Sequence, residues 1–93
     1  MVLYCVQYRK SALQHTITVR AIEAALANLV YVDEEFEPGS EPNKVFMIGY
    51  DMSGRPIELI VNVLDDGDVL VFHAMKLRSV FRPLLRRVEK GKP

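Results

Sequence analysis

The chain has 93 residues, of which 49% are hydrophobic and 26% charged, with 12 basic and 12 acidic side chains. This length and composition indicate one globular domain spanning residues 1–93. No apolar run approaches the roughly 20 residues needed to cross a bilayer, and no basic region precedes the short apolar N-terminus. We therefore expect a cytoplasmic protein with no membrane anchor. The single cysteine, Cys5, excludes an intramolecular disulfide, and with only two histidines it argues against a zinc site.

The first third of the chain predicts one strand and one helix. Residues 2–8 read VLYCVQY and indicate a strand. Thr18 is a suitable helix N-cap, and alanines raise the helix propensity after it. The apolar residues that recur there at helical spacing are Val19, Ile22, Leu26 and Leu29. Residues 33–43 are polar and contain Pro38, Gly39 and Pro42, so we expect a loop.

Three strands and a tail helix are predicted in the remainder. The strand candidates at 44–50, 56–64 and 68–75 are rich in Val, Ile, Leu and Phe. Residues 77–88 favour a helix, which must begin at Pro83 or be broken there, because proline cannot lie deep inside a helix. The resulting order, β-α-β-β-β-α, defines a two-layer α+β domain with an antiparallel sheet.

Glycine-containing turns set the predicted strand register. Asp66-Gly67 and Ser53-Gly54 each suit the centre of a two-residue hairpin turn. The second hairpin then pairs Leu64 with Val69, Asn62 with Val71, Ile60 with His73 and Glu58 with Met75. The first hairpin pairs Tyr50 with Ile57 and Gly49 with Glu58. A slip of one residue in either turn would move side chains to the opposite face.

This register gives the sheet two different faces. One face is apolar and predicts a helix packed on it; its members are Phe46, Ile48, Tyr50, Ile57, Leu59, Val61, Val63, Leu70, Phe72 and Ala74. The other face carries Glu58, Asn62 and His73, with Gly49 leaving space beside Glu58. Because Glu58 and His73 are diagonal neighbours across the strand pair, their side chains are expected to meet.

A carboxylate and an imidazole on one face suggest acid–base chemistry. Glu58 can accept a proton and His73 can donate one. His15, just before the helix, is a third acid–base candidate. The alternative is that these residues are half-solvated polar positions with a structural role.

Basic residues are concentrated at the C-terminus. Residues 1–75 have 5 Lys/Arg and 11 Asp/Glu, whereas residues 76–93 have 7 Lys/Arg and only Glu89. A basic tail favours a polyanion or an acidic partner protein, or it is a solvated helix end. The cations that we expect to bind a phosphate are Arg55, Lys76, Arg78 and Arg82. Metal-free RNA cleavage requires the same three roles: a base, an acid and a cation at the phosphate.

Several short motifs resemble the BrnT-type toxins of bacterial type II toxin–antitoxin pairs, which have a RelE-like fold. The resemblance spans roughly residues 8–85. It rests on His15-Thr16-Ile17-Thr18, on Val45 to Gly49, on Gly54 to Val61 and on Val71 to Arg78. The chain is also similar to a group of short bacterial proteins with a Ser-Ala-x-x-His segment (Ser11, Ala12, His15) and a His-Ala-Met segment (His73–Met75).

The resemblance implies an endoribonuclease that acts on mRNA without a cofactor, and an antitoxin partner that covers its site. BrnT-type proteins commonly have Ser-Ala-Arg-Lys on the last strand, whereas this chain has His-Ala-Met-Lys, so only Lys76 matches the two basic positions. The alternative function is a non-enzymatic interaction or oligomerising module, for example a homodimer. Its surface would use the apolar residues of the second face, which are Met47, Ile60, Val71 and Met75.

Overall fold

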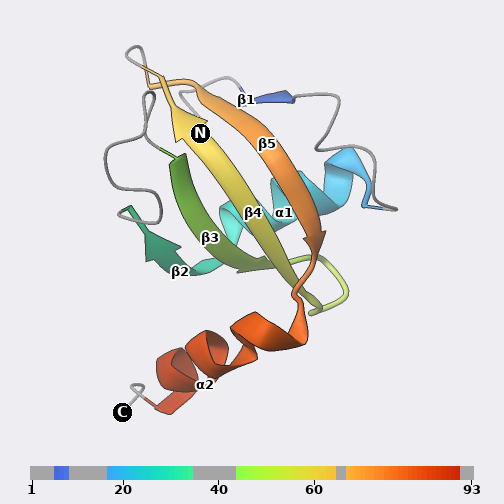
Figure 1. Ribbon diagram of the computed structural model, residues 1–93. Coiled ribbons are helices and arrows are strands. Elements are labelled where there is room, and N and C mark those ends of the chain that lie inside the picture. Colours follow the sequence, from blue (N-terminus) through green and yellow to red (C-terminus); the bar gives the residue numbers. More distant parts are fainter. Residues whose placement is uncertain (1–5, 9–16, 35–43, 65–66, 91–93) are drawn as a thin grey trace.

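The computed structural model describes residues 6–8, 17–34, 44–64 and 67–90. Its strands form one five-stranded sheet in the order β1-β5-β4-β3-β2 (Figure 1). Strands β2 to β5 are antiparallel, and β1 pairs in parallel with β5. The elements are β1 (Val6–Tyr8), α1 (Val19–Ala27), β2 (Leu29–Asp33), β3 (Lys44–Tyr50), β4 (Pro56–Val63), β5 (Val69–Lys76), the 3-10 helix η2 (Ser79–Phe81) and α2 (Arg82–Lys90).

The α+β composition and the antiparallel sheet confirm the coarse prediction, but β2 was not predicted. We expected the helix to continue through Leu29, whereas it ends at Ala27. Asn28 ends it, because its side-chain Nδ2 donates to the Ala24 carbonyl at 2.8 Å and its backbone N–H donates to the Ala25 carbonyl. The chain then enters β2 directly. At the other end of α1, the Thr18 cap is confirmed, since its hydroxyl accepts from the Ala21 N–H at 3.1 Å.

The turn between β3 and β4 contains one residue more than predicted. The Asp51 N–H donates to the Arg55 carbonyl and the Gly54 N–H to the Asp51 carbonyl, which gives a three-residue loop with Gly54 at a φ of 81°. Gly49 consequently pairs with Ile57, and Glu58 lies opposite Ile48. The predicted register of this hairpin was therefore wrong by one residue.

The predicted register of the second hairpin is wrong near the turn and right beyond a β-bulge. The Leu64 N–H donates to the Asp68 carbonyl, so Val63 pairs with Val69 and Asn62 with Leu70, and the predicted pairs at this end are wrong. A register shift then occurs opposite the step from Ile60 to Val61, where β5 contains an additional residue, Phe72. Beyond this bulge the expected pairs Ile60–His73 and Glu58–Met75 are present.

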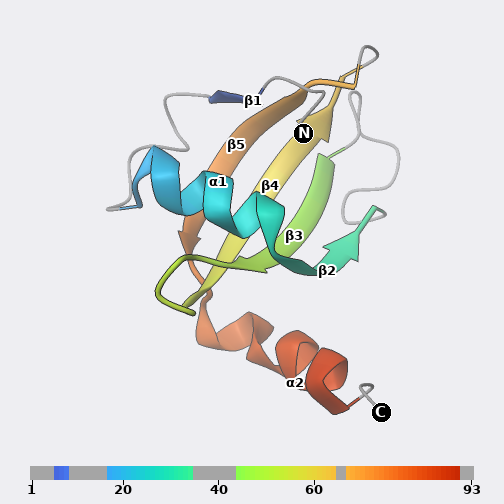
Figure 2. The ribbon, with the colours of Figure 1, turned by 180° about the vertical axis from the view of Figure 1, so that it is seen from behind.

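The sheet has an apolar cluster on each face. Figures 1 and 2 show α1 lying across one face. The cluster under α1 contains Ile17, Ile22, Ala25, Val45, Met47, Ile57, Leu59, Val61, Val69, Val71 and Ala74. The cluster on the other face joins β3 to the C-terminal helix through Phe46, Ile48, Leu77 and Leu85. The expectation of a single core face, which grouped Phe46 and Ile48 with Ile57, was therefore wrong.

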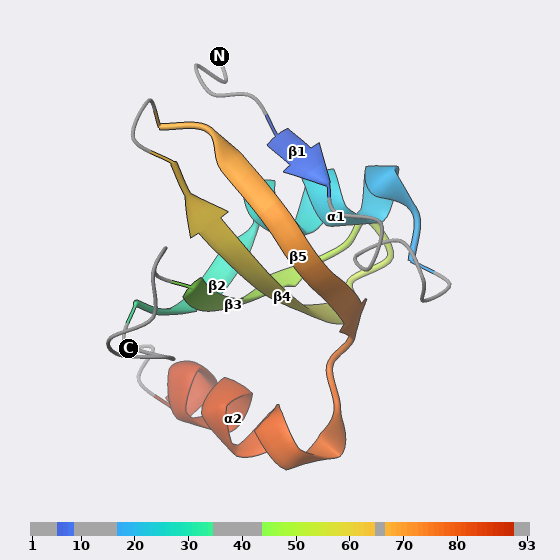
Figure 3. The same cartoon turned by 45° about the horizontal axis from the view of Figure 1, so that its top comes forward.

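Helix α2 extends the predicted two layers by a partial third layer. It follows the end of β5 and lies below that end of the sheet (Figure 3). Pro83 is the second residue of α2, where its missing N–H and fixed φ are tolerated. The preceding turn, η2, allows this start because it carries the chain away from β5 before the proline.

Gly49 allows α1 to approach the sheet closely. A Cβ built on Gly49 would lie 2.0 Å from the Ala25 carbonyl oxygen and 2.7 Å from its carbon. The expectation that Gly49 leaves open space beside Glu58 was wrong, since the helix backbone fills that space. No side chain larger than hydrogen fits without moving α1.

We predict that Gly49→Ala lowers the free energy of unfolding by about 2–3 kcal/mol, because a clash with backbone must be relieved by shifting a packed helix. Gly54→Ala is the matched control: its Cβ would meet nothing within 4 Å, and only its positive φ is unfavourable, a cost of about 1 kcal/mol. Urea unfolding measures both. Equal losses for the two variants would contradict the close approach of α1 at Gly49.

Candidate functional site

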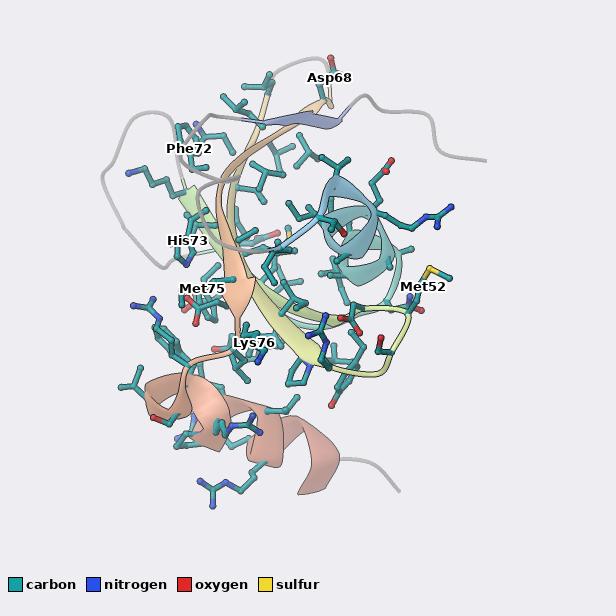
Figure 4. The ribbon with its side chains drawn as sticks, turned by 90° about the vertical axis from the view of Figure 1, so that its right-hand side faces the viewer. Met52, Asp68, Phe72, His73, Met75 and Lys76 are labelled. Atoms are coloured by element: carbon teal, nitrogen blue, oxygen red, sulfur yellow. The ribbon has the colours of Figure 1, made fainter. Side chains whose placement is uncertain are left out.

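The side chains of Glu58, His73 and Arg78 meet on the face of the sheet opposite α1. Glu58 lies on β4 and His73 on β5, while Arg78 lies between β5 and η2. His73 Nε2 is 2.9 Å from Glu58 Oε2, which confirms the predicted diagonal contact. Figure 4 shows His73 and Met75 on one side of β5, with Lys76 near the end of that strand. The bulge at Phe72 allows this contact. The additional residue shifts β5 by one position relative to β4, so that His73 pairs with Ile60.

Arg78 holds the Glu58 carboxylate through several hydrogen bonds. Its Nη2 donates to Oε2 at 2.7 Å, and its Nε is 3.1 Å from both carboxylate oxygens. The Arg78 backbone N–H also donates to Oε1 at 3.0 Å. A guanidinium in this geometry binds a carboxylate more strongly than a lysine can. We name Glu58, His73 and Arg78 together the carboxylate cluster.

Burial and hydrogen bonding act on Glu58 in opposite directions. The side chain is fully buried, whereas those of His73 and Arg78 are 23% and 49% exposed. Burial raises the pKa of Glu58, but the hydrogen bonds from Arg78, followed by that from His73, lower it more, so the pKa lies below its usual value. The hydrogen bond to Glu58 in turn raises the pKa of Arg78. The cluster therefore contains an ionised carboxylate and a permanent guanidinium at neutral pH.

This geometry favours a positioning role for Glu58. A general base must come within hydrogen-bond distance of the proton that it removes. Both Glu58 oxygens face donors from the protein and neither is open to solvent. The carboxylate instead orients an imidazole and a guanidinium, which are partly exposed and able to contact a ligand.

Aromatic rings support the guanidinium from behind. The Arg78 Cζ atom lies 5.2 Å from the centre of the Phe81 ring, and that ring lies 4.7 Å from the ring of Phe46. Phe46 is almost fully buried. A guanidinium stacked on a fixed ring loses little conformational freedom when it binds an anion. Sequence reasoning gave Phe81 no role, although its position three residues after Arg78 is a weak signal.

The other predicted phosphate ligands lie together in a hollow that no member of the carboxylate cluster lines. Arg55, Lys76 and Arg82 line a hollow of about 230 Å³ at the end of the sheet, with Pro56 and Leu77 between them. We name this the basic hollow. Arg78 was predicted to bind phosphate together with these three cations. It does not line the hollow and pairs with Glu58 instead.

Arg55 is held in the basic hollow by a residue that the sequence analysis did not identify. Asp51 is buried; its Oδ2 accepts from Arg55 Nε at 2.9 Å, and its Oδ1 accepts from the backbone N–H groups of Ser53 and Arg55. The backbone hydrogen bond from Arg55 is the largest influence on Asp51 and lowers its pKa, although burial acts in the opposite direction. An aspartate immediately before a glycine-containing turn is the signal that could have identified it.

Three other predictions concern His15, Asn62 and the apolar patch on the second face of the sheet. His15 lies outside the described residues. Asn62 is buried on β4, four residues beyond Glu58, and its Oδ1 has no hydrogen-bond partner among the described residues. The apolar patch expected on the second face is divided, because Met47 and Val71 belong to the cluster under α1.

Known proteins give no assignment for this fold and site. No protein-family model, curated protein or solved structure matches the chain. Among the described residues, no helix is long and apolar enough to span a bilayer, and no three His, Cys, Asp or Glu side chains lie close enough to hold a metal ion.

We predict that Glu58→Gln lowers the free energy of unfolding at pH 7 by about 2 kcal/mol, since an amide has no charge and only one acceptor oxygen where the carboxylate uses two, and the partial exposure of Arg78 limits the loss. The folded pKa of Glu58 is below its unfolded value. Its stabilisation is therefore complete above the unfolded value, about 4.3, and is lost as the pH falls through the folded pKa.

Urea unfolding of the wild type and Glu58→Gln between pH 3 and 7 tests this expectation. The difference in stability between the two proteins should narrow as the pH falls below about 4. Glu23→Gln, an exposed carboxylate on α1, is the control and should change stability by less than about 0.5 kcal/mol. A constant difference at every pH would show that Glu58 is not held as an ionised carboxylate.

Proposed function

We propose that this protein is a metal-independent endoribonuclease that acts on mRNA, as the toxin component of a type II toxin–antitoxin pair with a RelE-like fold. The observation that carries the proposal is the carboxylate cluster, in which one buried carboxylate presents an imidazole and a guanidinium at the same surface. The motif resemblance to BrnT-type toxins is a second, independent support.

The cluster supplies two of the roles that RNA cleavage requires. In the reaction, the 2′-hydroxyl oxygen attacks the adjacent phosphorus and the bond from phosphorus to O5′ breaks, which leaves a 2′,3′-cyclic phosphate and a 5′-hydroxyl. Arg78 stabilises the negative charge that develops on the phosphate oxygens. His73 acts as the general acid and donates a proton to O5′.

Glu58 orients the imidazole ring. Its carboxylate lies 2.9 Å from Nε2 of His73, and this contact fixes the direction in which the ring faces. The proton of the 2′-hydroxyl passes to solvent or to His15, and solvent reprotonates His73 after each turnover. Protons and charge therefore balance over the cycle.

The contacts of Arg78 favour a second candidate, an interaction module without catalysis. They connect β4 to the segment that leads into α2, so the same geometry would serve to dock the C-terminal helix. Such a module would bind a partner protein, such as an antitoxin or a second copy of the chain, and would leave RNA intact. Cleavage assays separate the two functions.

We predict that His73→Gln lowers the rate of RNA cleavage at least about 100-fold, because general acid catalysis contributes 10²- to 10⁴-fold. Arg78→Lys should also be strongly impaired, since lysine keeps the charge but loses the two-point geometry. The assay uses labelled RNA with EDTA present, and the products are analysed for 2′,3′-cyclic phosphate ends. Circular dichroism shows whether each variant is folded.

Arg87→Ala is the charge control, because Arg87 is exposed on α2 and lies outside the cluster; it should cleave normally. In bacteria, induction of the wild type should arrest growth and produce new mRNA 5′ ends, and His73→Gln should do neither. A folded wild type that neither cleaves RNA nor arrests growth would leave the interaction module as the function.

A further inference from the structure

The basic hollow is built to receive an anion. Its three cations come from three different elements: Arg55 precedes β4, Lys76 ends β5 and Arg82 begins α2. The floor is fixed by a hydrogen bond from the Leu77 N–H to the Pro56 carbonyl at 3.0 Å. No carboxylate lines this hollow, and within the described chain no ion pair engages Lys76 or Arg82. Two positive charges at this small depression thus have no carboxylate partner among the described residues.

Arg55 adds hydrogen-bond donors to the basic hollow but little net charge. Asp51 neutralises it, but the contact uses only Nε, and the Arg55 side chain is 52% exposed. The terminal nitrogens of an arginine held in this way remain available to donate to a second anion. Asp51 thus orients the guanidinium of Arg55, as Glu58 orients that of Arg78.

A second depression shares Arg55 with the basic hollow. This depression, of about 160 Å³, lies between the start of α1 and the turn between β3 and β4. Its lining includes Arg20 and Arg55, together with Asp51, which pairs with Arg55, but not Lys76 or Arg82. Arg20 is exposed in the first turn of α1, and the sequence analysis gave it no role. Arg55 therefore links one depression to the other.

We propose that Arg20, Arg55, Lys76 and Arg82 form a phosphate-binding track for single-stranded RNA beside the carboxylate cluster. The chain connects the two sites directly, since only Leu77 separates Lys76, the last residue of β5, from Arg78. The inference rests on the proposed function for the identity of the polyanion. Attack by a 2′-hydroxyl requires a strand free to bring that oxygen in line with O5′, so the substrate is single-stranded and its neighbouring phosphates need their own ligands.

Binding of a fluorescein-labelled DNA 12-mer, measured by fluorescence anisotropy, tests the track without cleavage, because the probe has no 2′-hydroxyl. Each phosphate contact to a single strand contributes about 0.7 to the slope of log affinity against log salt concentration. Arg20→Ala, Lys76→Ala and Arg82→Ala should each reduce that slope by about 0.7 and weaken binding about 3- to 10-fold at low salt.

Arg87→Ala is the matched control. It removes the same charge, but its position five residues after Arg82 places it on a different side of α2, so it should change neither quantity. If Arg87→Ala weakens binding as much as the track variants, binding depends on net charge alone and the track is wrong. A double-stranded 12-mer that binds more tightly than the single strand would also overturn the proposal.

Cleavage assays distinguish a failure of the track from a failure of the proposed function. Track variants should raise KM for a 12-nucleotide RNA but not for a dinucleotide with one phosphodiester, which contacts only the carboxylate cluster. If the wild type cleaves both RNAs and no track variant changes KM, the track is wrong and the ribonuclease remains. If no RNA is cleaved but the variants reduce the salt dependence of DNA binding, the track stands and the ribonuclease is wrong.

Discussion

The structure depends on the compensation of one buried carboxylate. An ionised Glu58 without partners would cost several kcal/mol in the interior of the protein. Arg78 and His73 offset that cost, and doing so fixes the chain between β5 and η2 against β4. The position of the segment that leads into α2 and the orientations of Arg78 and His73 follow from this one constraint.

The sequence predicted part of this site for a sound physical reason. Glu58 and His73 belong to neighbouring strands, and alternation along each strand places both on one face. Arg78 could not be predicted as the partner of Glu58, because it lies beyond the end of β5. There the alternation of a strand no longer specifies which way a side chain points. Asp51 was missed because its carboxylate bonds to its own turn, an interaction that depends on the loop having three residues.

The fold was predicted less well where a single residue decides the register. The turn ending at Gly54 has one residue more than the Ser53-Gly54 interpretation assumed, and this moved Phe46 and Ile48 to the face opposite α1. Strand β2 was missed because Leu29 fits both a helical period and a strand, and only the side-chain bond of Asn28 ends the helix before it. Composition and periodicity therefore gave the class of fold, while hydrogen bonds at turns decided which residues share a face.

The bulge at Phe72 has a consequence for how this hairpin can vary among related chains. The longer turn shifts β5 by one residue relative to β4, and Phe72 shifts it back before His73. A relative of the same length with a two-residue turn and no bulge would keep the same Glu58–His73 contact, whereas a relative of the same length with only one of these changes would separate the pair. Turn length and bulge should therefore change together among related chains, as a linked signature of the site.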